Sequence, residues 1–405
     1  MTSVGSPMNS PSLNFNPLKN PDSRTRVLVV DDSFFMQRRL TEILHSAADL
    51  RVVGYADNGA EAIKLAERLS PDVITMDINM AKFDGLHAID YIMRSNPKPI
   101  VIISSYTQKG SRAAFYGLDL GVIDIVEKPS SSGIALDIAD RASEIITKVR
   151  TAARVRVVRT LNGDGTDAPL SKPIEFNTAV VPSKQPAGGD SSFDFPHGLP
   201  QVIGIGASTG GPVVLQELLH VIPTEFFPPV VVVQHLPERF TRELASQLDA
   251  ISSLNIVEAQ EGQVLKNGTV YVARGGTHLQ IDSSGQLVIN NGAPVNHCKP
   301  SVDVTFHSLA RHYGPRALAL VLTGMGEDGA VGALAIKRAG GSVIAQDEAS
   351  CVVFGMPAAA IRAGAVDKVL SLEAIKKLMV RVSELSSAAV PAASSLPVPT
   401  TPSRS

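Results

Sequence analysis

A glycine-rich turn with a serine at its apex is the part of this sequence best suited to chemistry. Gly206-Ala207-Ser208-Thr209-Gly210 follows an apolar run at 199–205 and precedes a predicted helix at 213–219. Such a strand-to-helix turn can present a nucleophilic hydroxyl above a parallel sheet. It can also hold a dinucleotide pyrophosphate at the helix N-terminus. A third interpretation is that Ser208 only caps the helix.

The end of the next predicted strand favours the nucleophile. The apolar run at 229–233 ends in Gln234-His235. A dinucleotide fold needs an acidic residue there to bind the ribose hydroxyls. A histidine fits instead a general base that faces Ser208 across neighbouring strand ends. The chain also has no Tyr-x-x-x-Lys pair, the commonest signature of short-chain dehydrogenase chemistry.

A serine and a histidine need a third group that orients the imidazole and stabilises its protonated form. Asp328 is the candidate, because it follows another predicted strand, at 318–322, within a glycine-rich turn. The adjacent Glu327 is a competing carboxylate, and an Asp-Gly pair is also typical of an ordinary turn. Three strand ends would then supply Ser208, His235 and Asp328 in that order, which differs from the Ser-Asp-His order of the common α/β-hydrolases.

The same turns offer backbone N–H groups near Thr209 and Met325 that can form an oxyanion hole. This chemistry needs no cofactor. His278 and the pair His297-Cys298 do not form a spaced pattern of metal ligands.

A second set of polar residues lies at strand ends in the first part of the chain. Apolar runs at 26–30, 72–76 and 99–103 alternate with amphipathic stretches, and the residues that follow them are Asp31-Asp32, Asp77, Ser104 and, further on, Lys128. Carboxylates brought together need a cation, and hard oxygen ligands favour Mg²⁺. One aspartate can then attack a phosphoryl donor, while the lysine and the hydroxyl bind the transferred group.

The elements that must position both sets are parallel strands alternating with helices. We therefore predict an α/β fold with two doubly wound parallel-sheet domains. The first occupies residues 25–145 and the second residues 198–386. Residues 1–24, 146–197 and 387–405 are rich in Ser, Pro, Gly and Ala, which predicts a disordered tail, a flexible linker and a second disordered tail.

Composition excludes several classes of function. The net charge of -2 and the absence of a helix-turn-helix pattern argue against a regulator that binds nucleic acid. The first residues lack a signal peptide and no apolar run is long enough to span a bilayer, so we expect a cytoplasmic protein without membrane insertion. Two cysteines in 405 residues favour reduced thiols over a disulfide framework.

The first domain resembles the receiver domains of response regulators. The resemblance rests on Asp31-Asp32, on Asp77 in Val73–Met80, on Asp84-Gly85, on Ser104 and on Lys128-Pro129. It implies a flavodoxin-like fold in which Asp77 is phosphorylated and Asp32, Asp77 and the Asn79 carbonyl ligate Mg²⁺, with Asp31 acting through water. Ser104 and Lys128 would bind the phosphoryl oxygens. Two departures are Ala81, where the family usually has proline, and Ile125, where it usually has an aromatic residue.

The second domain resembles the catalytic domain of the chemotaxis protein-glutamate methylesterases of the CheB type. The matching segments are 205–211, 233–237, 300–304, 322–330, 345–348 and 354–357, and Arg274 is one departure from a usual proline. The resemblance implies a Rossmann-like, phosphorylation-activated hydrolase that demethylates glutamate methyl esters on methyl-accepting chemoreceptors. Deamidation of receptor glutamines is a second implied activity, and a chemotaxis histidine kinase is the implied phosphodonor. The alternatives are a phosphorylation-regulated scaffold, in which Ser208 does no chemistry, and a regulator that acts on DNA.

Overall fold

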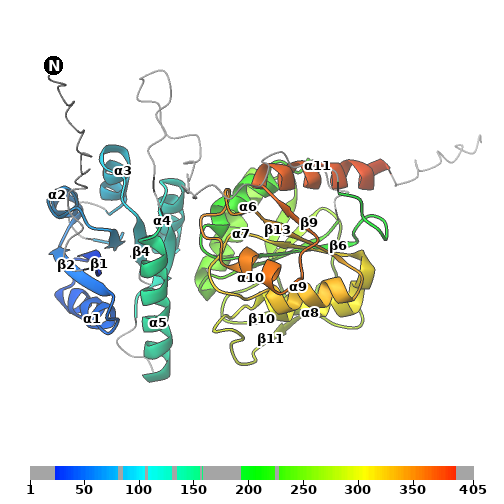
Figure 1. Ribbon diagram of the computed structural model, residues 1–405, viewed down its shortest axis with the longest axis horizontal. Coiled ribbons are helices and arrows are strands. Elements are labelled where there is room, and N and C mark those ends of the chain that lie inside the picture. Colours follow the sequence, from blue (N-terminus) through cyan, green and yellow to red (C-terminus); the bar gives the residue numbers. More distant parts are fainter. Residues whose placement is uncertain are drawn as a thin grey trace, which may run out of the picture.

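The computed structural model describes residues 23–80, 85–104, 108–129, 135–155, 157, 193–223 and 228–388. Most of the expected tails and most of the expected linker lie outside these residues. The described chain forms two α/β units, each built on its own sheet (Figure 1). None of its helices has the length and apolar character needed to cross a bilayer.

The first unit is a five-stranded parallel sheet with helices on both faces. Its strands are β1 (Thr25–Val30), β2 (Leu50–Ala56), β3 (Val73–Met76), β4 (Ile100–Ser104) and β5 (Asp124–Glu127). Its helices are α1 (Phe34–His45), α2 (Gly59–Leu69), α3 (Gly85–Ser95), α4 (Gln108–Asp119) and α5 (Ala135–Ala152). Helix α5 continues past residue 145, where we expected the linker to begin.

The strand order of this sheet is β2-β1-β3-β4-β5, and all neighbouring strands are parallel. The inner strands β1, β3 and β4 are mostly apolar and buried because helices cover both faces of the sheet. The chain reverses its winding direction between β1 and β3. The carboxyl ends of these two strands therefore flank a crevice, and a crevice of this kind is where ligands bind in open α/β sheets.

The second unit is built on a seven-stranded parallel sheet. Its strands are β6 (Val202–Ala207), β7 (Val230–Gln234), β8 (Asn255–Glu258), β9 (Thr269–Val272), β12 (Ala317–Val321), β13 (Ser342–Gln346) and β14 (Lys368–Leu370). Its helices are α6 (Gly211–His220), α7 (Glu238–Ile251), α8 (Val302–Tyr313), α9 (Ala330–Arg338), α10 (Met356–Arg362) and α11 (Leu372–Ala388), with a 3₁₀ turn at Gly314–Arg316.

The order of this sheet is β14-β13-β12-β6-β7-β9-β8. Winding reverses between β6 and β12, so the turns that carry Ser208 and Asp328 leave the sheet on either side of one switch point. The doubly wound fold predicted for both domains is thus confirmed. The second unit also contains an antiparallel hairpin of β10 (His278–Ile281) and β11 (Leu287–Asn290) beside α8, which was not predicted from the sequence.

The two units contact each other through α4, β5 and α5 of the first, and Figure 1 shows α4 and α5 on the side that faces the second unit. Phe115 of α4 packs against Phe240 of α7, with ring centroids 6.2 Å apart. Val352, from a loop of the second unit, lies in the same apolar cluster as Val149 and Ala152 of α5. The interface includes turns at the carboxyl end of the second sheet, since Thr209 after β6 contacts Asp124 and Met325 after β12 contacts Thr151.

Candidate functional sites

The three predicted carboxylates of the first unit lie together at its switch point. Asp31 follows β1 and Asp77 follows β3, and both are almost fully buried, whereas Asp32 is exposed. Carboxylate oxygens of the three residues lie within 4.8 Å of one another. Closely spaced hard oxygen donors are the ligand type that Mg²⁺ and Ca²⁺ take, so the residues present fit a divalent cation.

Lys128 joins this cluster from the end of β5. Its Nζ lies 2.6 Å from Asp31 Oδ2 and 2.8 Å from Asp77 Oδ2. Burial opposes the charge of the lysine, but the neighbouring Asp77 and Asp31 carboxylates outweigh it and raise the pKa of Lys128 above its usual value. Burial raises the pKa of Asp31. The cluster is therefore a partly neutralised anionic site with a cation at its edge.

Ser104 and Asn79 complete the surroundings of Asp77. Ser104 ends β4 and is buried, and the Asn79 side chain donates to its hydroxyl at 3.4 Å. The backbone N–H of Asn79 donates to Asp77 Oδ1 at 3.1 Å. All the residues predicted around the phosphoryl site are thus brought together at one end of the first sheet.

The Ser208 turn follows β6 as expected, and it is not a helix cap. Helix α6 begins at Gly211, and its N-cap is Gly210 with φ of 77°. The turn packs tightly against the end of β12, since a Cβ at Gly324 would lie 2.9 Å from Ser208 Cβ. Ser208 is almost buried, with 8% of its surface exposed.

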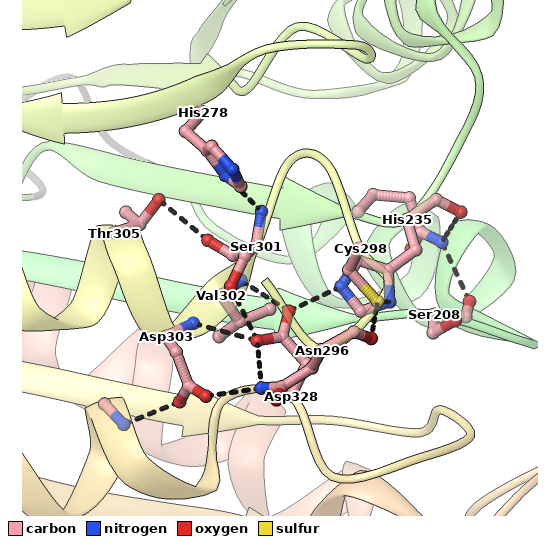
Figure 2. A network of polar contacts seen from close by, with 12 residues as sticks. Ser208, His235, His278, Asn296, Cys298, Ser301, Val302, Asp303, Thr305 and Asp328 are labelled. Carbon is pink, nitrogen blue, oxygen red and sulfur yellow. Dashed lines mark hydrogen bonds and ion pairs between the residues drawn. The ribbon is translucent and has the colours of Figure 1, made fainter. Parts of the chain in front are cut away.

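His235 and Asp328 form a direct pair, as the sequence predicted. His235 Nε2 lies 2.8 Å from Asp328 Oδ2 (Figure 2). Glu327, the competing carboxylate, is exposed, and no bond among the described residues joins it to His235. The structure therefore selects Asp328 over its neighbour.

His235 uses its two ring nitrogens differently. Because Nε2 faces Asp328, the nitrogen left for another partner is Nδ1, which lies 3.7 Å from Cys298 Sγ. The hydroxyl of Ser208 makes no hydrogen bond to His235 in the described part of the chain. Ser208 and His235 are instead linked through the side chain of Gln234. Its amide donates to the backbone carbonyl of Ser208 at 2.8 Å and to the backbone carbonyl of His235 at 3.4 Å.

Asp328 is held by the N-terminus of α8, a contact that was not predicted from the sequence. Its Oδ2 accepts from the Val302 N–H at 2.7 Å, and its Oδ1 accepts from Ser301 Oγ at 2.7 Å and the Asp303 N–H at 3.2 Å. Asn296 Nδ2 adds a contact of 3.4 Å, as Figure 2 shows. A helix N-terminus stabilises negative charge. The only signal in the sequence was the family segment at 300–304.

This environment sets the charges of the pair. Burial alone would raise the pKa of Asp328, but hydrogen bonds from His235, Ser301 and Val302 lower it below its usual value. For His235, burial lowers the pKa, but the hydrogen bond to Asp328 and the contact with Cys298 outweigh burial and raise it to about 10. The resting pair is thus a carboxylate beside an imidazolium.

The two residues predicted to support an oxyanion lie at the interface between the units. Thr209 is buried, and its Oγ1 donates to Asp124 Oδ2 of β5 at 2.5 Å. Met325 is half-buried, and Thr151 of α5 donates to its sulfur at 2.7 Å. Both turns beside Ser208 are therefore held by residues of the first unit.

These features define a class: a receiver-type domain joined to an α/β domain with a Ser, His and Asp constellation at its switch point. The family model described as "CheB methylesterase" matches residues 203–379, and "Response regulator receiver domain" matches residues 27–138. The chain belongs to the family of CheB methylesterases that carry a receiver domain, which confirms the predicted resemblance. Receiver domains of this kind hold a divalent metal at the phosphorylation site.

Curated relatives match nearly the whole chain. A protein-glutamate methylesterase/protein-glutamine glutaminase of Salmonella typhi is 39% identical over 360 residues, which cover 88% of this chain and 96% of the relative. One from Carboxydothermus hydrogenoformans is 41% identical over 368 residues, covering 89% and 99%. The solved CheB methylesterase catalytic domain of Thermotoga maritima is 40% identical, with a TM-score of 0.43, and covers 46% of this chain and 98% of its own.

Proposed function

We propose that this protein removes methyl groups from glutamate γ-methyl esters of chemoreceptors and that phosphorylation of its receiver domain controls this activity. The observation that carries the proposal is the His235–Asp328 pair, with Nε2 and Oδ2 2.8 Å apart, beside the Ser208 turn. The names and the near-complete coverage of the curated relatives support the substrate. The substrate is a protein surface in the cytoplasm, where the receptors carry their signalling helices.

In the first half of the reaction, Ser208 Oγ attacks the ester carbonyl carbon, and its proton passes to Nδ1 of His235. We assign Nδ1 because Asp328 occupies Nε2. His235 must first lose a proton, since its raised pKa keeps it charged at rest. The protonated ring then gives its proton to the departing methoxide, which leaves as methanol. Asp328 holds the ring and stabilises its positive charge.

The second half removes the acyl group from Ser208. Water attacks the acyl carbon and gives one proton to His235. The bond between Ser208 Oγ and the acyl carbon then breaks as His235 returns that proton to the serine, and the released glutamic acid gives its own proton to solvent. The same steps on a glutamine side chain release ammonia, which is the deamidation that the relatives' names include. We place the oxyanion against the backbone N–H groups near Thr209 and Met325, in the two turns that flank Ser208.

In the receiver domain, we propose Asp77 as the residue that accepts a phosphoryl group from a chemotaxis histidine kinase. Asp32, Asp77 and the Asn79 carbonyl would hold Mg²⁺, and Asp31 would act through water. When bound, the metal neutralises charge on the phosphoryl oxygens. Lys128 then exchanges its contact with Asp77 for one with the phosphoryl group, and the Ser104 hydroxyl donates to it.

The interface between the two units suggests how the receiver domain controls the hydrolase. We propose that the receiver domain blocks the active site by covering the carboxyl end of the second sheet, and that phosphorylation shifts the population toward an uncovered state. Asn79 contacts Ser104 at the end of β4, and α4, which packs against α7, follows this strand in the chain. A change at Asp77 can therefore reach the interface through Asn79, Ser104 and α4. Deleting the receiver domain should raise the basal activity.

A fluorophosphonate probe tests the hydrolase proposal against the scaffold alternative. The probe should label the wild-type chain at Ser208 and not the Ser208→Ala variant. Methanol release from methylated receptor membranes should be lost in that variant, while phosphorylation of Asp77 continues. Equal labelling or equal methanol release in Ser208→Ala would remove Ser208 as the nucleophile.

A further inference from the structure

Cys298 lies beside Nδ1 of His235, the candidate catalytic histidine. Its Sγ is 3.7 Å from His235 Nδ1, the nitrogen that the proposed mechanism uses, and Figure 2 shows the sulfur beside the imidazole ring. Cys298 is half-buried, so solutes can reach it. His235, Cys298 and Asp328 form one of the two groups of potential metal ligands found among the described residues.

The separation of nitrogen and sulfur fits a shared zinc ion. Zn²⁺ binds imidazole nitrogen at about 2.0–2.1 Å and thiolate sulfur at about 2.3 Å, so tetrahedral geometry places the two donor atoms roughly 3.6 Å apart. The observed 3.7 Å allows both atoms to ligate one ion with little movement. The mixture of imidazole and thiolate donors also favours zinc over Mg²⁺.

The other side of the ring already has the arrangement typical of zinc-binding histidines. A histidine that binds a metal through one nitrogen usually donates the N–H of the other to a carboxylate, which fixes the ring and raises its basicity. His235 Nε2 makes this bond to Asp328 at 2.8 Å. Asp328 is in turn fixed by Ser301 and the start of α8. The ring is therefore held in place with Nδ1 directed toward Cys298.

We propose that His235 Nδ1 and Cys298 Sγ bind Zn²⁺ and that the bound ion inhibits the hydrolase. The Cys298 thiol and the His235 imidazolium each lose a proton to solvent, the thiolate and the neutral ring bind the ion, and water fills the remaining positions of the zinc. The ion then occupies the nitrogen that must accept the proton of Ser208. Zinc binding stands on the geometry alone, whereas inhibition rests on the proposed function.

Calorimetric titration of the full-length chain with Zn²⁺ tests the binding, with millimolar Mg²⁺ present to occupy the receiver carboxylates. We expect one zinc ion per chain in the wild type and in Ser208→Ala, which has no nucleophile. Cys298→Ser should weaken this binding at least tenfold. Cys351→Ala removes the only other cysteine, a buried one, and should not change the affinity. Circular dichroism checks that each variant is folded.

Methanol release, measured in the same Mg²⁺ buffer, tests the inhibition. Zinc should inhibit the wild type and Cys351→Ala alike, a chelator should restore activity, and Cys298→Ser should need at least tenfold more zinc for half inhibition. Binding or inhibition that Cys298→Ser leaves unchanged would overturn the site, as would a wild type that takes up no zinc. Zinc binding at Cys298 without inhibition would overturn only the claim that the bound ion inhibits the hydrolase. Zinc binding to Ser208→Ala is independent of catalysis, so failure of the proposed function is distinguishable from failure of the metal site.

Discussion

The hydroxyl of Thr209 donates a hydrogen bond of 2.5 Å to the carboxylate of Asp124, and this contact ties the residue after Ser208 to the receiver domain. Asp124 is buried and also pairs with Lys148 of α5 at 2.9 Å. The receiver thus contributes an ion pair to the wall of the candidate active site. This relationship gives the proposed inhibition by the receiver domain a specific contact that can be removed.

Thr209→Val should raise the basal activity. The change keeps the shape of the side chain and removes the donor, while Asp124 keeps its ion pair with Lys148. A hydrogen bond to a charged group contributes about 1.5–3 kcal/mol, so we expect a roughly tenfold higher basal rate of methanol release. The rate of the fully phosphorylated protein should stay unchanged. Gln216→Ala removes an exposed contact of 3.4 Å with Asp119 at the same interface and serves as the control with a smaller effect. Equal changes in the basal and phosphorylated rates would instead indicate a role in catalysis.

Asp77→Asn should abolish activation by acetyl phosphate. The variant lacks the carboxylate that would accept the phosphoryl group and that pairs with Lys128 at 2.8 Å. Phosphate incorporation and methanol release are measured with and without acetyl phosphate. Asp90→Asn, which changes a half-exposed aspartate paired with Arg94 in α3, is the matched control and should be activated normally. Full activation of Asp77→Asn would exclude Asp77 as the phosphorylation site.

The pH dependence of hydrolysis should report the His235–Asp328 pair. The pKa of His235 is raised to about 10, and the protonated ring cannot accept a proton, so kcat/KM should increase with pH up to about 10. Asp328→Asn removes the charge that favours imidazolium, which should move the rising limb to lower pH. Its maximal rate should fall roughly 10³- to 10⁴-fold, as expected when the group that orients a catalytic histidine is lost. If kcat/KM of Asp328→Asn rose over the same pH range as that of the wild type, the result would contradict the pairing of His235 with Asp328.

The raised pKa of His235 also makes the stability of the protein depend on pH. Because the folded-state pKa of His235 lies above the usual 6.5, its protonated ring stabilises the folded protein fully below pH 6.5. That stabilisation is lost as the pH rises from 6.5 through about 10. The free energy of unfolding of the wild type should therefore exceed that of His235→Gln most at pH 6, and the difference should shrink toward pH 10. Urea denaturation across this range measures it, and a constant difference would count against the shifted pKa.

Ser301→Ala should lower kcat without changing KM. Ser301 donates to Asp328 Oδ1 at 2.7 Å and does not face the substrate in the proposed mechanism, so it acts by positioning Asp328. We expect about a tenfold loss in kcat and a displaced pH profile. Ser308→Ala, which changes a buried serine inside α8, is the control, because among the described residues its hydroxyl bonds to the Thr305 carbonyl and the Ile281 N–H and not to Asp328. A pH profile displaced equally in both variants would indicate general destabilisation of α8.

The sequence was most informative where chemistry lies at the ends of apolar strands. Parallel strands place their carboxyl ends at one edge of a sheet, so the sequence alone groups Ser208, His235 and Asp328. The same reasoning grouped Asp31, Asp77 and Lys128. The structure brings these three together and pairs His235 with Asp328, while Ser208 is linked to His235 only through the Gln234 side chain among the described contacts. The predicted start of the linker at residue 146 falls inside α5 (Ala135–Ala152), because the amphipathic pattern does not mark where this helix ends.

The tertiary structure decided what depends on contacts between segments distant in the sequence. Nothing local shows that α8 supplies N–H groups to Asp328, that Gln234 joins the backbones of Ser208 and His235, or that Cys298 lies beside Nδ1. The contact of Thr209 with Asp124 spans two domains. Strand patterns and family motifs determine which residues gather at a switch point, because parallel strands place the residues that follow them at one edge of the sheet. The direction in which each side chain points, and the partner it finds there, follow from packing that only the folded chain specifies.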